Sequence, residues 1–149
     1  TAKAEILWGL EQADVVKLSD DEVEFLFGMD PEAGAKHICS CYGAKLVFVT
    51  CGANGCWFEN SLSCGHIDAP RVIAAIDTTG AGDIFGGSAI WKLLQSGKRP
   101  DQLTEQELLD ITRFSCAAAT LSTQASGGLS SIPDYKEVCR LLTVYSKEI

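Results

Sequence analysis

The sequence lacks three features, each of which would point to a particular class of protein: a long apolar run, an excess of positive charge and closely paired cysteines. No apolar segment approaches the roughly 20 residues that cross a bilayer, and no basic, apolar leader is visible. The 12 basic and 20 acidic residues give a net charge of −8, which argues against nucleic acid or an anionic membrane as the main partner. We therefore expect neither a nucleic acid nor a membrane as a partner.

The seven cysteines form no CxxC pair, and their odd number leaves at least one thiol unpaired. Free thiols indicate a reducing compartment, so we expect a cytoplasmic protein. His37, Cys39 and Cys41 suggest a metal site, but on a helix Cys39 would point away from the other two. The only methionine is Met29 and the chain begins at Thr1, so we expect a processed protein or a piece of a longer one.

Apolar and charged residues make up 46% and 21% of the chain, which is ordinary for a globular domain or part of one. We predict strands at Val15–Leu18, Leu46–Thr50 and Val72–Ile76, and a hairpin of Gly55–Glu59 and Ser61–Ile67 turned at Asn60. We predict helices over Ala2–Ala13, from a Ser19 cap to Gly28, from Asp30 and Pro31 to Gly43, over Ile84–Leu94, from a Thr104 capping box to about Ser122, and from Pro133 onward. This alternation indicates an α/β fold with a mainly parallel sheet and helices on both faces, a Rossmann-like αβα arrangement.

The most informative segment is the run DTTGAGD, from Asp77 to Asp83, between a predicted strand and a predicted helix. A glycine-rich turn into a helix leaves backbone N–H groups unpaired at the positive end of the helix dipole, where they bind phosphate or a developing anion. Asp83 lies in the first turn and stays ionised. A carboxylate beside an anion site is what phosphoryl transfer to a hydroxyl requires. The alternative, a capped and closely packed turn, is weaker because seven consecutive residues share this chemistry.

Two shorter segments allow two interpretations each. The residues from Thr50 to Gly55 form either a turn that contacts nucleotide phosphates or a tight turn into the hairpin, and alone they favour the hairpin turn. Ser19 followed by Glu22 is a capping box, which is the favoured interpretation; alternatively, Glu22 orders a water on a phosphate-bound Mg²⁺. Thr50–Gly52 and Asp77–Asp83 would both lie at the carboxyl edge of the sheet, where ligands bind in such folds.

The run Asp77–Asp83, followed by Phe85 and Gly86-Gly87, resembles the C-terminal signature of the ribokinase-like (PfkB-type) carbohydrate kinases. Further segments resemble other family motifs in the family's order: Val16–Glu22, Thr50–Gly55, Ala117–Gly127 and Ser131–Pro133. Leu7-Trp8 and the triplet Lys17-Leu18-Ser19 resemble the fructokinase branch, with Ser19 where the broader family has Asn.

The resemblance implies that residues 1–149 are the C-terminal nucleotide-binding and catalytic part of a ribokinase-like fold, without the family's N-terminal sugar-binding and lid part. It makes Asp83 the general base, with an anion hole from the amides of Gly80, Ala81 and Gly82. The ATP site would comprise Thr50, Gly52 and Gly55, with Ser19 and Glu22 at the Mg²⁺–phosphate group and Cys116 and Ala119 beside the adenine. A potassium-type cation would be held by Asp77, Thr79, Ser122, Gly127 and Ser131.

The function implied is ATP-dependent phosphorylation of a sugar hydroxyl, with fructose as the first choice. Ribose, a 2-keto-3-deoxy sugar acid or a nucleoside are alternative acceptors, and an inactive nucleotide-binding fragment is the alternative from another class. We expect the isolated chain to be inactive. We also expect one sheet edge and much apolar surface to be exposed unless a second copy, as a homodimer, or the missing N-terminal half covers them.

Overall fold

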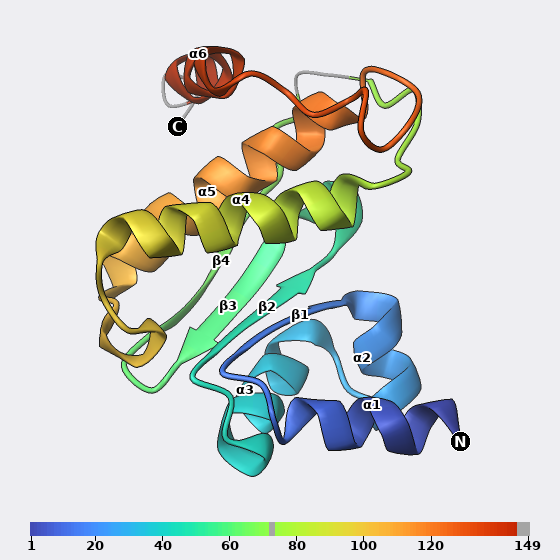
Figure 1. Ribbon diagram of the computed structural model, residues 1–149, viewed down its shortest axis with the longest axis vertical. Helices are drawn as coiled ribbons and strands as arrows, with labels where there is room; N and C mark the ends of the chain where they lie inside the picture. The colour runs from blue at the N-terminus through green and yellow to red at the C-terminus, as the bar shows by residue number, and fades with distance from the viewer. Residues whose placement is uncertain (72–73, 146–149) are drawn as a thin grey trace.

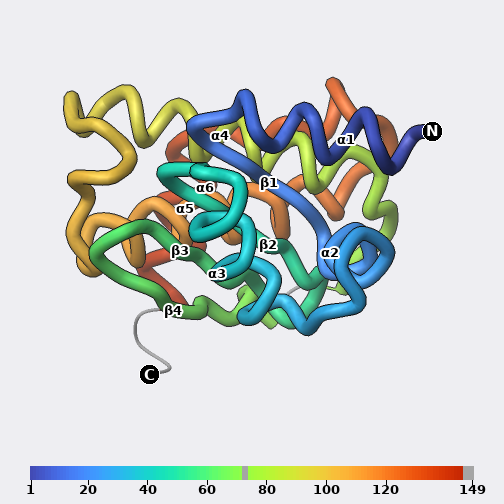
Figure 2. The backbone as a smooth tube through the Cα atoms, turned by 90° about the horizontal axis from the view of Figure 1, so that it is seen from below, coloured from blue at the N-terminus to red at the C-terminus, as the bar shows by residue number. Residues whose placement is uncertain are grey.

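A four-stranded sheet in the order β1-β2-β3-β4 separates two layers of helices in the computed structural model, which describes residues 1–71 and 74–145 (Figure 1). The strands are β1 (Val15–Ser19), β2 (Leu46–Thr50), β3 (Cys56–Asn60) and β4 (Cys64–Ile67). One face is covered by α1 (Ala2–Leu10), α2 (Asp20–Phe27) and α3 (Pro31–Tyr42), which lie nearest the viewer in Figure 2. The other face is covered by α4 (Ala81–Ser96) and α5 (Glu105–Ser122), and α6 (Tyr135–Tyr145) packs on α5 outside the layers.

The central strand β2 explains the three layers. Its side chains alternate, so Leu46 and Phe48 contribute to the core under α4 and α5, while Val47 and Val49 contribute to the core under α1–α3. A strand buried on both faces has to be apolar throughout, and this one reads Leu-Val-Phe-Val. The predicted αβα arrangement is confirmed.

The prediction of a mainly parallel sheet is wrong. Only β1 and β2 run parallel, whereas β2 pairs with β3 and β3 with β4 in the antiparallel sense. Only the short 3₁₀ turn Gly52–Asn54 separates β2 from β3, and such a connection can reverse the chain but cannot cross over to a parallel position. The hairpin itself was predicted and is present, with its turn after Asn60.

The predicted strand at Val72–Ile76 is not seen in its described part; Val72 and Ile73 lie outside the described residues. The remainder, from Ala74 to Ile76, has no strand partner and is exposed. Its polar groups bond to the end of α5 instead: the Ile76 N–H donates to the Thr123 carbonyl at 2.8 Å, and the Gln124 side chain donates to the Ala74 carbonyl at 2.7 Å. The segment is therefore held by a helix end and not by the sheet.

Most helix boundaries follow the predicted caps. Ser19, Asp30 and Thr104 each accept an N–H from the first turn of α2, α3 and α5, and Gly28 and Gly43 end the first two of these helices. The first and last helices are shorter than predicted, since α1 ends at Leu10 and α6 begins at Tyr135. None of the helices described here is both long and apolar enough to cross a membrane.

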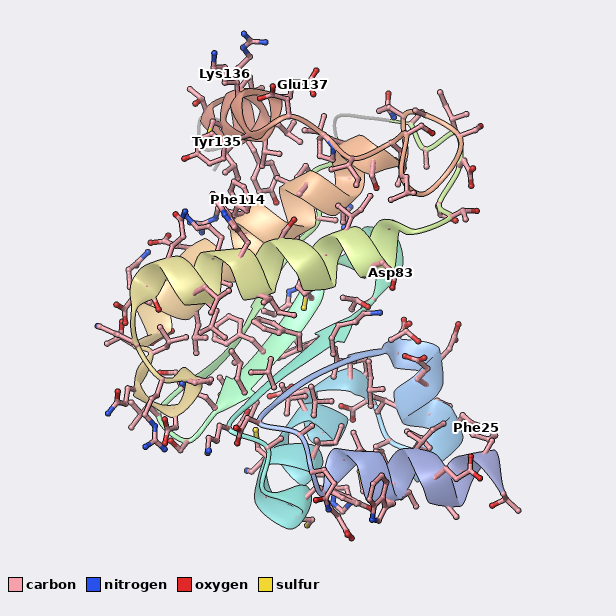
Figure 3. The ribbon with its side chains drawn as sticks, viewed as in Figure 1. Phe25, Asp83, Phe114, Tyr135, Lys136 and Glu137 are labelled. Carbon is pink, nitrogen blue, oxygen red and sulfur yellow. The ribbon has the colours of Figure 1, made fainter. Side chains whose placement is uncertain are left out.

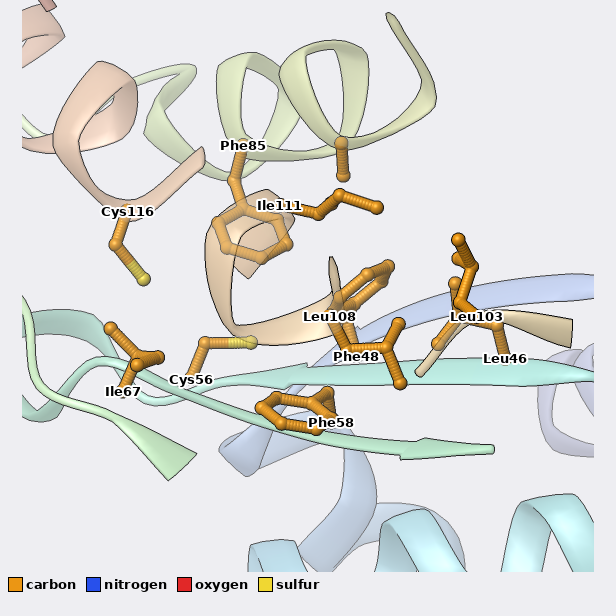
Figure 4. Packing of buried hydrophobic residues seen from close by; sticks show 11 residues of the cluster. Leu46, Phe48, Cys56, Phe58, Ile67, Phe85, Leu103, Leu108, Ile111 and Cys116 are labelled. Atoms are coloured by element: carbon orange, nitrogen blue, oxygen red, sulfur yellow. The ribbon is translucent and has the colours of Figure 1, made fainter. Parts of the chain in front are cut away.

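Helix α4 is fixed to the sheet by Phe85, which lies in its second turn. Phe85 is 2% exposed and meets Phe48 of β2 edge to face, with ring centroids 5.5 Å apart (Figure 4). Buried aromatic pairs of this kind add about 0.5–1.5 kcal/mol beyond the burial of their area. Because Asp83 precedes Phe85 by two residues, this contact also fixes where the start of α4 lies relative to the strand ends.

Candidate functional site

The strands β1 and β2 end side by side, which brings two predicted site residues together. Ser19 pairs with Thr50 at the last position of the parallel register. The Thr50 hydroxyl donates to the Leu18 carbonyl at 3.3 Å, so it also ties the two strand ends to each other. Ser19 and Thr50 therefore both lie at the carboxyl edge of the parallel pair, where the α/β rule expects a ligand.

Ser19 and Glu22 form a complete capping box at the start of α2. The Glu22 N–H donates to Ser19 Oγ at 3.2 Å, and the Ser19 N–H donates to Glu22 Oε2 at 2.7 Å. The capping interpretation is therefore confirmed. Only Oε2 is used in the box, and Glu22 is exposed, so the second carboxylate oxygen is available to water at the edge of the site.

The glycine turn leads into the start of α4, where several backbone N–H groups have no hydrogen-bond acceptor among the described residues. Gly80 caps α4 with φ at +80°, a conformation that favours glycine, and a Cβ there would lie 3.1 Å from the Gly128 Cα. The Ala81 N–H donates to the Thr78 carbonyl at 3.2 Å, and the Ile84 N–H donates to Gly80. In the described part of the chain, the N–H groups of Gly80, Gly82 and Asp83 have no hydrogen-bond acceptor, so these amides, and not that of Ala81, can bind an anion.

A cavity of about 590 Å³ lies between the ends of β1 and β2, the start of α4 and the last turns of α5. It brings together most of the residues predicted for the ATP and anion sites, from four separate parts of the sequence. Those that line it are Ser19, Thr50, Gly52, Gly55, Ala81, Gly82, Cys116 and Ala119. Glu22 does not line it. A cavity of this size suits a nucleotide-sized ligand.

Cys116 forms part of the wall of this cavity as a neutral thiol. Burial, and secondarily the charge of Cys51, raises its pKa to about 12. All seven cysteines are free thiols, and Cys51, Cys56 and Cys116 are the buried ones. At neutral pH Cys116 is therefore an apolar contact surface and not a nucleophile.

Asp83 faces a second cavity, on the other side of the α4 start. This cavity has a volume of about 540 Å³ and is lined near Asp83 by Gly80, Ile84 and Gly87, and further along by the aromatic group of Trp91, Phe114 and Tyr135. Figure 3 shows Asp83 at the N-terminal end of α4, away from Phe114 and Tyr135. The open amides of the helix start thus lie between a nucleotide-sized cavity and an exposed carboxylate.

The predicted cation residues are partly brought together by Asp77. Its Oδ1 accepts the Thr79 N–H at 2.9 Å and its Oδ2 accepts the Gly127 N–H at 3.3 Å. Hydrogen bonds from the Thr79 side chain, then from these two amides, lower the pKa of Asp77, so it stays ionised. The carboxylate therefore holds the loop that contains Gly127 against the glycine turn.

The two predicted serines use their hydroxyls locally. Ser131 donates its N–H to the Gly127 carbonyl at 3.1 Å and its hydroxyl to Gly128, so it belongs to the same loop. Ser122 is buried in α5 and donates to the Ala119 carbonyl. Within residues 1–71 and 74–145, no cluster of three or more His, Cys, Asp or Glu side chains is arranged to hold a metal. The donors near Asp77 are carboxylate, carbonyl and hydroxyl oxygens, which suit a hard cation.

Sequence reasoning missed three charged residues that line the larger cavity, Lys17, Asp20 and Arg71. Lys17 lines it, and its Nζ lies 2.9 Å from the point that a Cβ on Gly82 would occupy. The signal was present in the strand pattern: Val16 is buried under α1–α3, so the next residue of β1 has to face α4. A lysine at that position, in an otherwise apolar strand, indicates a functional or paired charge.

Comparisons with known proteins find similar sequences and similar folds. A family model described as "pfkB family carbohydrate kinase" matches residues 1–135. A curated relative named "Probable fructokinase-4", from Arabidopsis thaliana, is 32% identical over 142 residues, which cover 95% of this chain and 43% of the relative. The chain therefore spans less than half the length of this relative.

Among solved structures, a fructokinase with bound ATP from Xylella fastidiosa superposes with a TM-score of 0.85 at 25% identity, covering 98% of this chain and 47% of that one. A fructokinase double mutant from Vibrio cholerae, bound to fructose, ADP and potassium ion, superposes with a TM-score of 0.82 at 27% identity. That match covers 94% of this chain and 44% of the other. The fold of the described residues is therefore part of the ribokinase-like fold.

Proposed function

Because the chain belongs to the pfkB family of carbohydrate kinases, we propose that it supplies the ATP site and the catalytic base of an enzyme that phosphorylates a sugar hydroxyl. The observation that carries the proposal is the arrangement around the start of α4. A nucleotide-sized cavity lies on one side of the open amides, and the Asp83 carboxylate lies on the other. Phosphoryl transfer needs a donor and an acceptor on opposite sides of the transferred group.

In the proposed reaction, the acceptor hydroxyl approaches from the Asp83 side and ATP from the cavity side. Asp83 takes the hydroxyl proton while the acceptor oxygen bonds to the γ-phosphorus and the bond to the bridging oxygen of ADP breaks. The open amides of Gly80, Gly82 and Asp83 stabilise the charge that develops on the γ-phosphoryl oxygens. Thr50, Gly52 and Gly55 line the cavity where the remaining phosphates would lie, and Cys116 and Ala119 line it where the adenine would lie.

We propose that ATP binds as its Mg²⁺ complex, in which the ion neutralises phosphate charge. The free oxygen of Glu22 then accepts a hydrogen bond from a water on the ion. We also propose a potassium-type cation at the oxygen-rich loop of Asp77, Thr79, Ser122, Gly127 and Ser131. The hydrogen bonds of Asp77 to Thr79 and Gly127 support a loop built around one negative charge.

Fructose is the acceptor that we propose, because the Arabidopsis relative and both superposed structures are fructokinases. Ribose, a 2-keto-3-deoxy sugar acid and a nucleoside remain the acceptors to compare with it. Assayed alone, the 149 residues should bind ATP but transfer its phosphoryl group to sugar slowly at best. An acceptor that is not held over Asp83 loses most of the advantage of orientation.

A direct test is a crystal structure of the chain with a non-hydrolysable ATP analogue. The phosphates should lie within hydrogen-bond distance of the amides of residues 80–83, with the adenine against Cys116 and Ala119. Phosphates bound elsewhere would contradict the proposed site. Incubation with ATP and the four acceptors, fructose first, tests the reaction, and rapid sugar phosphate formation would contradict the expectation for the isolated chain.

A further inference from the structure

Lys17 places its ammonium group at the start of α4, beside the open amides. It lies opposite Phe48 in the β1–β2 register, and Phe48 belongs to the core under α4 and α5. Lys17 therefore points to the α4 side of the sheet. Its ammonium group reaches the first turn of α4, where the helix dipole is positive.

No internal partner offsets this arrangement. In the parts of the chain that the structure describes, Lys17 forms no ion pair and no hydrogen bond, although other lysines do. Lys45, for comparison, pairs with Asp14 at 2.6 Å, and Lys98 pairs with Glu107 at 2.6 Å. Asp20 lines the same cavity but forms no salt bridge with Lys17, and Arg71, which also lines it, is a second cation.

The glycine at position 82 belongs to the same arrangement. A Cβ on Gly82 would lie 2.9 Å from Lys17 Nζ and 3.7 Å from its Cε, so any side chain there would push the ammonium group away. The absence of a side chain lets the cation and the open Gly82 amide face the same point of the cavity. A single oxyanion placed at that point would contact both.

We propose that Lys17 binds the terminal phosphates of the nucleotide, and that its ammonium stays on the γ-phosphoryl group during transfer. The inference rests on the proposed function and adds a catalytic residue to it. In the transfer step the hydroxyl proton goes to Asp83, the γ-phosphorus moves to the acceptor oxygen, and ADP leaves. The ammonium and the amides of the α4 start then form one site for the phosphoryl oxygens.

The test compares the affinities of ATP, ADP and AMP for the 149-residue chain and its variants by isothermal titration calorimetry. Lys17→Met should weaken ATP binding by about tenfold or more, the usual effect of losing one charge-assisted hydrogen bond, and should change AMP binding much less. The matched control is Lys136→Met, which removes the same charge from the exposed surface of α6 (Figure 3). Equal ATP affinities for the two variants would overturn the inference.

Three further variants keep the test decisive if Lys17→Met does not fold, as judged by its circular dichroism. Lys17→Arg keeps a cation and should retain more ATP affinity than Lys17→Gln. Gly82→Ala leaves Lys17 in the sequence but displaces its ammonium, and should also weaken ATP binding more than AMP binding. Unchanged ATP affinity in Lys17→Gln and Gly82→Ala would overturn the inference while leaving the proposed function intact. A parent chain that binds ATP no more tightly than adenosine would overturn the proposed function itself.

Discussion

At the scale of single residues, the site depends on which side of the α4 start each group faces. Gly82 lines the nucleotide-sized cavity and Asp83 the other one, although they are neighbours in the chain. Consecutive residues of a helix lie about 100° apart around its axis. One turn can therefore direct an amide towards a phosphoryl donor in one cavity and a carboxylate towards a hydroxyl acceptor in the other. The two roles therefore need only one helix start.

Asp83→Asn removes the proposed base with little change in shape. In any active form of the protein, turnover should fall by roughly 10²–10⁴-fold, the usual contribution of a general base, while ATP affinity is kept. Steady-state kinetics together with an ATP titration checks this prediction. Turnover within a few-fold of the parent would show that another group takes the proton.

Gly55→Ala should destabilise the fold instead of only weakening nucleotide binding. Gly55 has φ at +88° and ψ at −135°, and a Cβ there would overlap the Ile67 carbonyl oxygen and lie 2.8 Å from the Ala69 nitrogen. We expect a loss of about 3 kcal/mol or more in the free energy of unfolding, measured by urea denaturation. Gly28→Ala is the control: φ is +64° there too, but the space is open, so about 1 kcal/mol is expected. Similar losses for the two variants would contradict this account of Gly55.

At the scale of elements, side-chain caps determine where several helices begin. Thr104 and Glu107 form a capping box at the start of α5, and Glu107 also pairs with Lys98 at 2.6 Å. The box is therefore tied to the loop that follows α4. Since α4 and α5 together carry Gly82, Cys116 and Ala119, this end of the helix pair supports the cavity from a distance.

The hydrogen bond from Lys98, and then those from Thr104, lower the pKa of Glu107 from 4.5 to about 2. A carboxyl group with a lowered pKa in the folded state stabilises the fold fully above its unfolded pKa, and this contribution is lost as the pH falls towards 2. The difference in stability between the parent and Glu107→Gln should therefore be largest at neutral pH and should shrink from about pH 5 downward. Urea denaturation at several pH values measures it.

Glu105→Gln is the matched control, because it removes the same charge from the same turn of α5. In the described structure the Glu105 side chain makes no hydrogen bond, so its substitution should have a smaller effect at neutral pH. A Glu107→Gln difference that stays constant from pH 7 to pH 3 would contradict the assigned ionisation.

At the scale of the whole molecule, the described residues leave a sheet edge and several large apolar side chains exposed. In the described residues β1 pairs only with β2, so its outer edge has free backbone groups. Large apolar side chains are also exposed, among them Trp8 at 67%, Phe25 at 63% and, on α4, Leu94 at 75%. Open strand edges and apolar surface of this kind favour association.

We therefore expect the 149-residue chain to bind the dye ANS and to associate as its concentration rises, either with a second copy or with an N-terminal half supplied in trans. Sedimentation velocity over a hundredfold range of concentration measures the association. Ile90→Glu with Leu94→Glu, on the exposed side of α4, should reduce both dye binding and association. A chain that is monomeric at every concentration and binds no dye would contradict the prediction.

The sequence by itself determined the local structure: where α2, α3 and α5 begin, where the hairpin turns and which run forms the glycine turn. Caps, turn residues and apolar periodicity act over a few positions, so they can be read without knowing the fold. The tertiary structure alone decided two points: that residues 74–76 bond to the end of α5 and form no strand, and that Lys17 meets Gly82. Each of these depends on how elements far apart in the chain pack and in what register, and no local pattern contains that information.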